Sequence, residues 1–251
     1  MRSGNPALND STFNSFRDGS YESSNAMTIS GAATKTMILL GLCFGAAAMT
    51  WGMVAGQNMQ GAVPWMIGGV VAGLIFGLAT SFKPTWAPVT APLYALAEGL
   101  FLGGLSAMYE AQFHDGIVFQ ALLATFGTTF SLLIAYQFGI IKATENFKLG
   151  VFAATGGIAM MYLAMMLMSM FGMSVSIMSM GWLGIGISVV VVIVAAMNLV
   201  LDFDYIEQAA QNGAPKYCEW YAAYGLMVTL VWLYVEILRL IAMLAGRSRN
   251  D

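Results

Sequence analysis

Residues 180–201 read MGWLGIGISVVVVIVAAMNLVL, an apolar run that contains no charged side chain. A helix needs about 20 mostly apolar residues to cross the hydrocarbon core of a bilayer, which is about 30 Å thick. Because this run has that length, we predict that it crosses a membrane as a helix. The number of such runs then decides the fold.

Six further apolar runs of spanning length occur along the 251 residues. In chain order, the seven predicted spans cover residues 36–56, 64–82, 88–109, 116–140, 149–171, 180–201 and 220–245. Hydrophobic residues make up 59% of the chain and charged residues 9%, whereas soluble domains have about 45–50% and about 25%. We therefore predict an all-α integral membrane protein, with a seven-helix domain over residues 35–246 and a disordered polar tail over residues 1–34.

Lysine and arginine predict the orientation, because cationic residues are retained in cytoplasmic loops. With the N-terminus inside, the inner segments carry Arg2, Arg17, Lys35, Lys83, Lys142, Lys148 and Lys216. The three outer loops carry none, and only Arg247 and Arg249 in the C-terminal tail oppose the pattern. We expect a cytoplasmic N-terminus and an outer C-terminus, and a six-helix alternative would place both ends inside. The first 34 residues contain no apolar run typical of a cleavable signal peptide.

Several functional classes are disfavoured by composition. Scattered cationic residues predict no nucleic-acid partner, and Cys43 and Cys218 form neither a metal motif nor a disulfide framework. His114 lies in an outer loop, so an intramembrane serine protease would lack a buried base. The methionines between Met160 and Met180 fall on different helix faces, which favours packing over a copper path. We expect no enzyme activity and no bound cofactor.

Glycines spaced four apart predict places where helices approach closely. Such stripes occur in the first three spans, as Gly41 and Gly45, Gly52 and Gly56, Gly69, Gly73 and Gly77, and Gly99 and Gly103.

Ionisable side chains inside the predicted spans are candidates for function, because each costs roughly 2.5–3.5 kcal/mol to insert. Glu98 lies about ten residues into the third span, near the bilayer midplane. Asp202 is predicted to end the sixth span at the cytoplasmic mouth of the bundle. Glu236 lies deep in the seventh span, and Arg239 follows on nearly the same face. Alternatively, Glu236 and Arg239 have no functional role and only neutralise each other as a local ion pair.

Asp202 and Asp204 cannot both face the bundle interior, because two residues are about 200° apart around a helix. Asp202 shares its face with Asn198 and Ala195. Asp204 shares a more apolar face with Val200. We expect Asp202 to face inward as a candidate for cation binding or proton sensing, and Asp204 to be peripheral. The alternative for Asp202 is a solvated acid at a helix end.

Carboxylates at three depths suit a path for a hard cation, since calcium prefers oxygen ligands. Glu98, Asp202 and Glu236 would supply this path if their helices converge, with Asp202 and Glu98 as the calcium ligands. A passive calcium leak, a metal- or proton-coupled transporter and a non-conducting regulator of another membrane protein all remain open.

Five stretches carry a family resemblance: RSGNPAL at 2–8, MTISGAATKT at 27–36, PLYALAEGLFLGGLSAMYE at 92–110, LVLDFDYIEQ at 199–208 and EWYAAYGLMVTLVWLYVEILRL at 219–240. In order and spacing they resemble the Bax inhibitor-1 or YccA-like family, also called the transmembrane Bax inhibitor motif family, and are closest to its bacterial branch. The resemblance implies two three-helix layers around a central C-terminal helix, in a bacterial cytoplasmic membrane.

The resemblance also implies a pH-sensitive calcium leak gated by two aspartates, one at the end of helix six and one in helix seven. Asp202 matches the first, but Thr229 stands near the position of the second. The nearest acid in that helix, Glu236, is about two turns further along. A two-aspartate gate is therefore not expected, and Asn198 and Thr229 are the polar side chains expected to line the path. The family further suggests a membrane-anchored quality-control protease as a partner, with the N-terminal tail as a possible contact.

Overall fold

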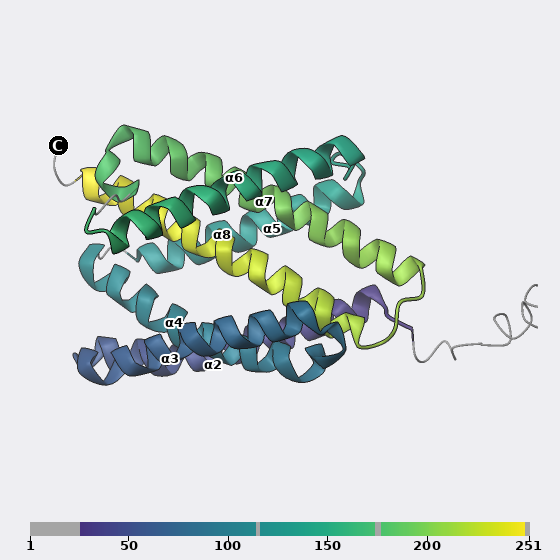
Figure 1. The fold of residues 1–251 in the computed structure, drawn as a ribbon, viewed down its shortest axis with the longest axis horizontal. Coiled ribbons are helices and arrows are strands. Elements are labelled where there is room, and N and C mark those ends of the chain that lie inside the picture. The colour runs from purple at the N-terminus through teal and green to yellow at the C-terminus, as the bar shows by residue number, and fades with distance from the viewer. Residues whose placement is uncertain (1–25, 114–115, 174–176, 249–251) are drawn as a thin grey trace, which may run out of the picture.

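We describe residues 26–113, 116–173 and 177–248 of the computed structural model (Figure 1). The long helices are α2 (Ile29–Ala55), α3 (Met59–Phe82), α4 (Ala87–Phe113), α5 (Ile117–Gln137), α6 (Glu145–Met170), α7 (Trp182–Gln211) and α8 (Cys218–Ser248), with short 3-10 turns at Pro84–Trp86 and Ile177–Met180. Within the described residues, seven helices are long and apolar enough to cross a membrane, which confirms the predicted fold class. Most of the predicted tail, with Arg2 and Arg17, lies outside the described residues, as do His114 and Arg249.

Helix α8 runs between two groups of three helices (Figure 1). Helices α2, α3 and α4 pack on one another in the first group, and α7 packs on both α5 and α6 in the second. Helix α8 contacts α2 and α4 on one side and α5 and α7 on the other. Its side chains Met227, Leu233 and Leu238 are buried in the main apolar core. The C-terminal helix is therefore the centre of the bundle, as the sequence resemblance implied.

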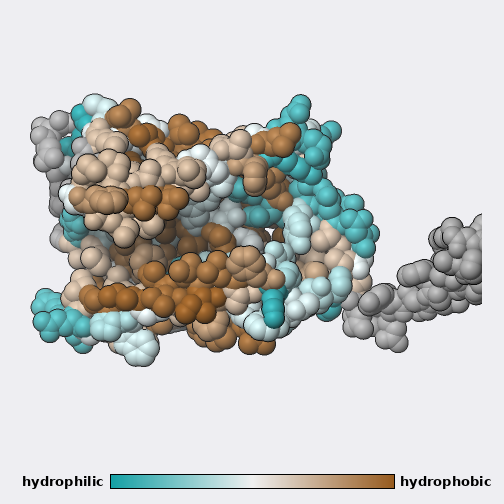
Figure 2. Space-filling view, in the orientation of Figure 1, coloured by the Kyte–Doolittle hydropathy of each residue, from teal (hydrophilic) through white to brown (hydrophobic). Residues whose placement is uncertain are grey.

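The outer surface of the bundle is largely apolar, as a membrane-spanning protein requires. Figure 2 shows hydrophobic residues over the middle of the visible face and hydrophilic residues towards its two ends. Helix α6 is the most exposed of the seven long helices. Its side chains Phe152, Met160 and Met170 are exposed, and Val151 is its one buried residue. Exposed methionines on α6 agree with lipid contact rather than with an internal metal path.

Helices α2 and α7 extend furthest beyond the bounds predicted from the apolar runs. Helix α2 begins at Ile29, where the Thr28 hydroxyl accepts a hydrogen bond from the Gly31 backbone N–H and caps the helix. Helix α7 continues to Gln211, so the prediction that Asp202 ends its helix is wrong. The extension is amphipathic, and its apolar residues Phe203 and Ile206 are buried against neighbouring elements.

The glycine stripes on α3 and α4 mark close helix contacts. A methyl group on Gly99 or Gly103 would collide with the Cys43 or Ala47 backbone of α2, and one on Gly69 would meet the Ala97 carbonyl oxygen at 2.6 Å. The stripe predicted on α2 does not mark such a contact. Nothing lies within 4 Å of a methyl group built on Gly41, Gly45 or Gly52. Helix α2 packs through its Cys43 and Ala47 side instead, so these three glycines face outward.

The substitution Gly103→Ala is expected to lower the thermal stability of the purified protein. The added methyl group meets backbone of α2, which cannot rotate away, and overpacking of this kind costs typically about 1–3 kcal/mol. The matched control is Gly41→Ala, which adds the same group in open space. Thermal unfolding in detergent checks the difference, and equal losses in the two variants would contradict the packing described here.

Candidate functional site

Asp202 lies inside α7 and faces α8. Its Oδ2 atom is buried and has no hydrogen-bond partner among the described residues. The hydroxyl group of Thr229 on α8, a buried residue, lies close enough to interact with the carboxylate. Asp202 is about 30 Å along the helix from Trp182, a distance equal to the hydrocarbon thickness of a bilayer. The carboxylate therefore sits near one end of the spanning region, inside the bundle rather than in solvent.

Asn198 shares the inward face of α7, one turn before Asp202. Its side-chain amide donates hydrogen bonds to the Thr155 hydroxyl of α6 at 2.8 Å and to the Val194 carbonyl at 2.9 Å. The bond to Thr155 ties α7 to α6, so Asn198 points towards α6 whereas Asp202 faces α8.

Asp204 does not face outward, although we expected it to be peripheral. Its Oδ2 accepts a hydrogen bond from Gln208 at 2.6 Å and lies 3.0 Å from the Lys148 amine of α6. The Tyr136 hydroxyl of α5 donates to Glu207 Oε2 at 2.5 Å and lies 3.4 Å from Asp204 Oδ1. Asp202 and Asp204 do point apart, but α7 is flanked by α8 on one side and by α5 and α6 on the other. Both carboxylates therefore meet other helices.

A cavity of about 820 Å³ opens beside this polar cluster. It lies between the C-terminal end of α5, the following link and α7, and it reaches α2 and α8. Its polar lining residues are Tyr136, Gln137, Lys142, Thr144, Asp204 and Glu207. The end of α7 thus carries a polar, partly acidic recess at the same end of the bundle as Asp202.

Glu236 is buried on α8 and paired with Arg239. The Arg239 Nη1 atom lies 3.0 Å from Glu236 Oε2 and 2.6 Å from the Tyr162 hydroxyl of α6. Tyr162 in turn donates a hydrogen bond to Glu236 Oε1 at 2.8 Å. A buried carboxylate with a cationic partner and a hydroxyl donor has most of its charge compensated within the protein.

Glu98 lies in the other half of the bundle, between α4 and α3. Its carboxylate is close to Gly73 of α3, where an added methyl group would come within 3.4 Å, and to the Tyr94 side chain of its own helix. The Tyr94 ring packs edge-on against Tyr224 of α8 at 5.0 Å, and the Tyr224 hydroxyl donates to the Gly77 carbonyl of α3. Glycines of α3 make room for this polar group.

The three predicted acids are separate. Asp202 lies near Thr229, and Glu236 is seven residues further along α8, about 10 Å along the helix axis. Glu98 contacts helices of the first layer. Within the described residues, no group of three or more acids, histidines or cysteines is close enough to hold a metal ion. Any cation path would therefore pass single carboxylates in turn rather than a multidentate site.

A fourth buried acid, Glu219, was missed in the sequence analysis. Its side chain is fully buried, and its Oε1 accepts hydrogen bonds from the Thr28 amide at 3.1 Å and the Thr28 hydroxyl at 2.9 Å. Lys216 lies 2.8 Å from Oε1, and Lys35 lies 3.3 Å from Oε2. A methyl group on Gly31 would collide with the carboxylate, so a larger residue there would displace Glu219 from its partners.

Glu219 thus fastens the start of α2 to the start of α8. The Met27 amide adds a backbone hydrogen bond to the Ala214 carbonyl at 2.7 Å, and Met27 and Ala222 belong to a small buried cluster beneath it. The sequence offered one signal, Lys216 three residues before Glu219. The partners from α2 are about 190 residues away and could only be found in the fold.

Comparison with known proteins identifies the family. A family model described as Bax inhibitor 1 like matches residues 5–246, nearly the whole chain. The chain belongs to the Bax inhibitor 1-like family. The resemblance carried by the five sequence stretches is confirmed at this level, and this Bax inhibitor 1-like chain is a multi-pass membrane protein with seven candidate spans. Comparisons with curated proteins and with solved structures gave no match.

The substitution Glu219→Gln is expected to destabilise this Bax inhibitor 1-like protein by about 1–3 kcal/mol, because it removes the charge that pairs with Lys35 and Lys216 and replaces one buried acceptor oxygen with a donor. Cleavage by added protease near residue 26 should become faster as the start of α2 detaches. Glu145→Gln is the control, since that acid pairs with Lys148 but its side chain is 87% exposed. Stability equal to the unsubstituted protein in Glu219→Gln would show that the cluster does not hold the two helices together.

Proposed function

We propose that this protein is a pH-sensitive cation leak pathway, with calcium as the ion, in a bacterial cytoplasmic membrane. The observation that carries the proposal is the buried Asp202 Oδ2, which has no hydrogen-bond partner in the described part of the chain. A buried carboxylate without a partner is costly, and either a cation or a proton relieves that cost. Calcium favours carboxylate and hydroxyl oxygens, and Asp202 with Thr229 offers both.

The cavity beside Asp204 and Glu207 would collect cations at the same end of α7 as Asp202, although Asp202 does not line it. Acidic groups in a recess raise the local concentration of cations. Lys142 lines the same cavity and Lys148 pairs with Asp204, so the recess is only partly acidic. This balance suits a leak that passes ions rather than a site that retains them.

Glu236 differs from Asp202 because its charge is already compensated within the protein. Because Arg239 and Tyr162 already compensate its charge, Glu236 is better suited to gating than to coordination. An ion that moves along α8 past Asp202 would meet Arg239, so conduction requires the pair to separate or turn aside. Glu98, in the first layer, is an accessory carboxylate for the cation path.

The proposed orientation keeps the N-terminus in the cytoplasm. Lys35, Lys83, Lys142, Lys148 and Lys216 all belong to the end of the bundle at which α2 begins (Figure 1). Cationic residues gather on the cytoplasmic side of bacterial membrane proteins. Asp202 and the cavity would then face the cytoplasm.

The substitution Asp202→Asn is expected to reduce calcium flux into liposomes about tenfold or more, because a charged ligand is replaced by a neutral one of the same shape. The dependence of flux on pH should also disappear, since the titrating group is removed. Purified protein, a calcium-sensitive dye inside the vesicles and a series of external pH values measure both effects.

Two variants accompany that measurement. Glu145→Gln removes an exposed acid at the same end of the bundle and should leave flux unchanged. Glu98→Gln tests the accessory carboxylate and should reduce flux less than Asp202→Asn does. Undiminished flux with an unchanged pH profile in Asp202→Asn would remove Asp202 from the pathway.

The alternative is a non-conducting regulator that binds a membrane-anchored quality-control protease. Thr28 is hydrogen-bonded to Glu219 of α8, and Met27 to Ala214 in the link before α8, so these two residues form an anchored point. Deletion of residues 1–25 leaves this anchor intact. Loss of partner co-purification with flux preserved would favour the regulator. Retained co-purification in a protein whose flux depends on Asp202 would favour the channel.

A further inference from the structure

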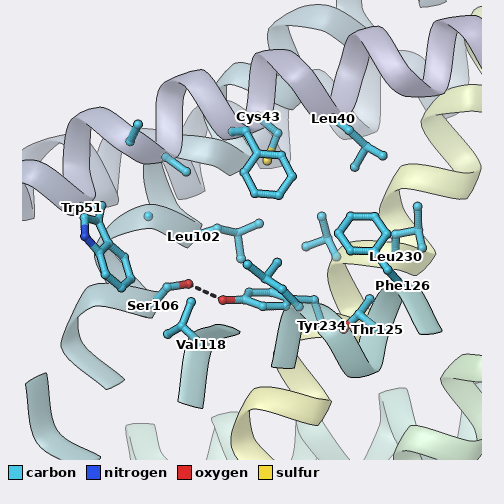
Figure 3. Close-up of a pocket in the computed structure, with 16 residues that line it drawn as sticks. Leu40, Cys43, Trp51, Leu102, Ser106, Val118, Thr125, Phe126, Leu230 and Tyr234 are labelled. Carbon is cyan, nitrogen blue, oxygen red and sulfur yellow. Dashed lines mark hydrogen bonds between the residues drawn. The ribbon is translucent and has the colours of Figure 1, made fainter. Parts of the chain in front are cut away.

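An apolar groove separates α2 from α5 in the middle of the bundle (Figure 3). Its volume is about 370 Å³, within the range of about 300–1,000 Å³ that small-molecule pockets occupy. Helices α4 and α8 form its inner wall, through Leu102 and Ser106 and through Leu230 and Tyr234. Within the described residues, α2 and α5 border the groove without packing closely on each other.

Three hydroxyl groups in the groove are already hydrogen-bonded within the protein. Ser106 Oγ and the Tyr234 hydroxyl form a 2.6 Å hydrogen bond, visible in Figure 3, and Thr125 Oγ1 donates to the Ala121 carbonyl at 2.7 Å. Around them the lining is aliphatic and aromatic. None of the described lining side chains carries a charge, so the groove suits hydrocarbon and not an ion.

The groove opens sideways at the depth of the hydrocarbon core. Phe44 and Ala48 of α2 border it and are exposed on the outer surface. They lie near the middle of α2, and Leu230 and Tyr234 lie near the middle of α8. The medium outside the opening is therefore the acyl chains of the surrounding lipids.

We propose that this groove binds one acyl chain of a membrane lipid. The acyl chain of the lipid lies between α2, at Phe44 and Trp51, and α5, at Leu122 and Phe126. Its end reaches inward to Leu230 of α8. A flexible hydrocarbon fills an irregular apolar recess and loses no polar contact on leaving the lipid phase. Its contacts join the two layers where α2 and α5 do not pack closely on each other, so the bound lipid completes the packing around α8.

A lipid that carries a photoactivatable diazirine in its acyl chain tests the proposal. The full-length protein is reconstituted with this lipid and irradiated, and the labelled peptides are identified by mass spectrometry. Labelling is expected to concentrate on the groove-facing residues of α2 and α5. Even labelling over all lipid-facing helices, with no preference for the groove, would overturn the proposal.

Two neighbouring residues give a matched pair of variants. Leu122→Trp fills the groove and should reduce groove labelling about tenfold, as expected when a bulky ring takes the place of the chain. Leu123→Trp adds the same ring one residue away, at an exposed position, and should leave groove labelling unchanged. Ala48→Phe narrows the mouth from α2 and should reproduce the loss if Leu122→Trp fails to fold. Equal labelling in Ala48→Phe, Leu123→Trp and the unsubstituted protein would contradict the proposal.

Discussion

The burial of α8 between two helical layers is the constraint on which the rest of the structure depends. Apolar contact alone does not drive helices together in a bilayer, because lipid chains are as apolar as the side chains. Helix α8 is held instead by close packing and by hydrogen bonds to both layers, such as Tyr234 to Ser106 of α4 and Glu236 to Tyr162 of α6. This central position also removes its acids from water.

The negative charge of a buried carboxylate must be compensated by nearby groups. Glu219, Glu236 and Asp202 differ in the groups that do so. Glu219 has Lys35, Lys216 and the start of α2, and Glu236 has Arg239 and Tyr162. Asp202 has only the Thr229 hydroxyl close by, and one of its oxygens has no partner within the described residues. The first two acids hold the fold together, whereas Asp202 is the acid that a mobile cation or proton can stabilise. The anchoring by Glu219 and Glu236 and the proposed role of Asp202 thus follow from the same energetic cost of burying a carboxylate.

The seven spans could be predicted because each depends on a local apolar run, but the tertiary partners could not. The helical continuation past Asp202 was missed because residues 203–211 are amphipathic and their apolar face is buried only against other helices. Glycine spacing predicted close packing equally for α2, α3 and α4. Spacing alone cannot distinguish a glycine that faces outward, such as Gly41, from a glycine that contacts another helix, such as Gly103. Glu219 was missed because its partners on α2 come from the far end of the chain. The layered arrangement around α8 came from the family resemblance and not from periodicity.

Locating the ion tests the central claim most directly. Crystals grown with calcium, and measured at a wavelength where calcium scatters anomalously, would place the ion without reliance on any variant. The account predicts an anomalous peak between Asp202 and Thr229, which is lost in crystals of Asp202→Asn. A peak confined to the recess at Asp204 and Glu207, or no peak inside the bundle at saturating calcium, would contradict it.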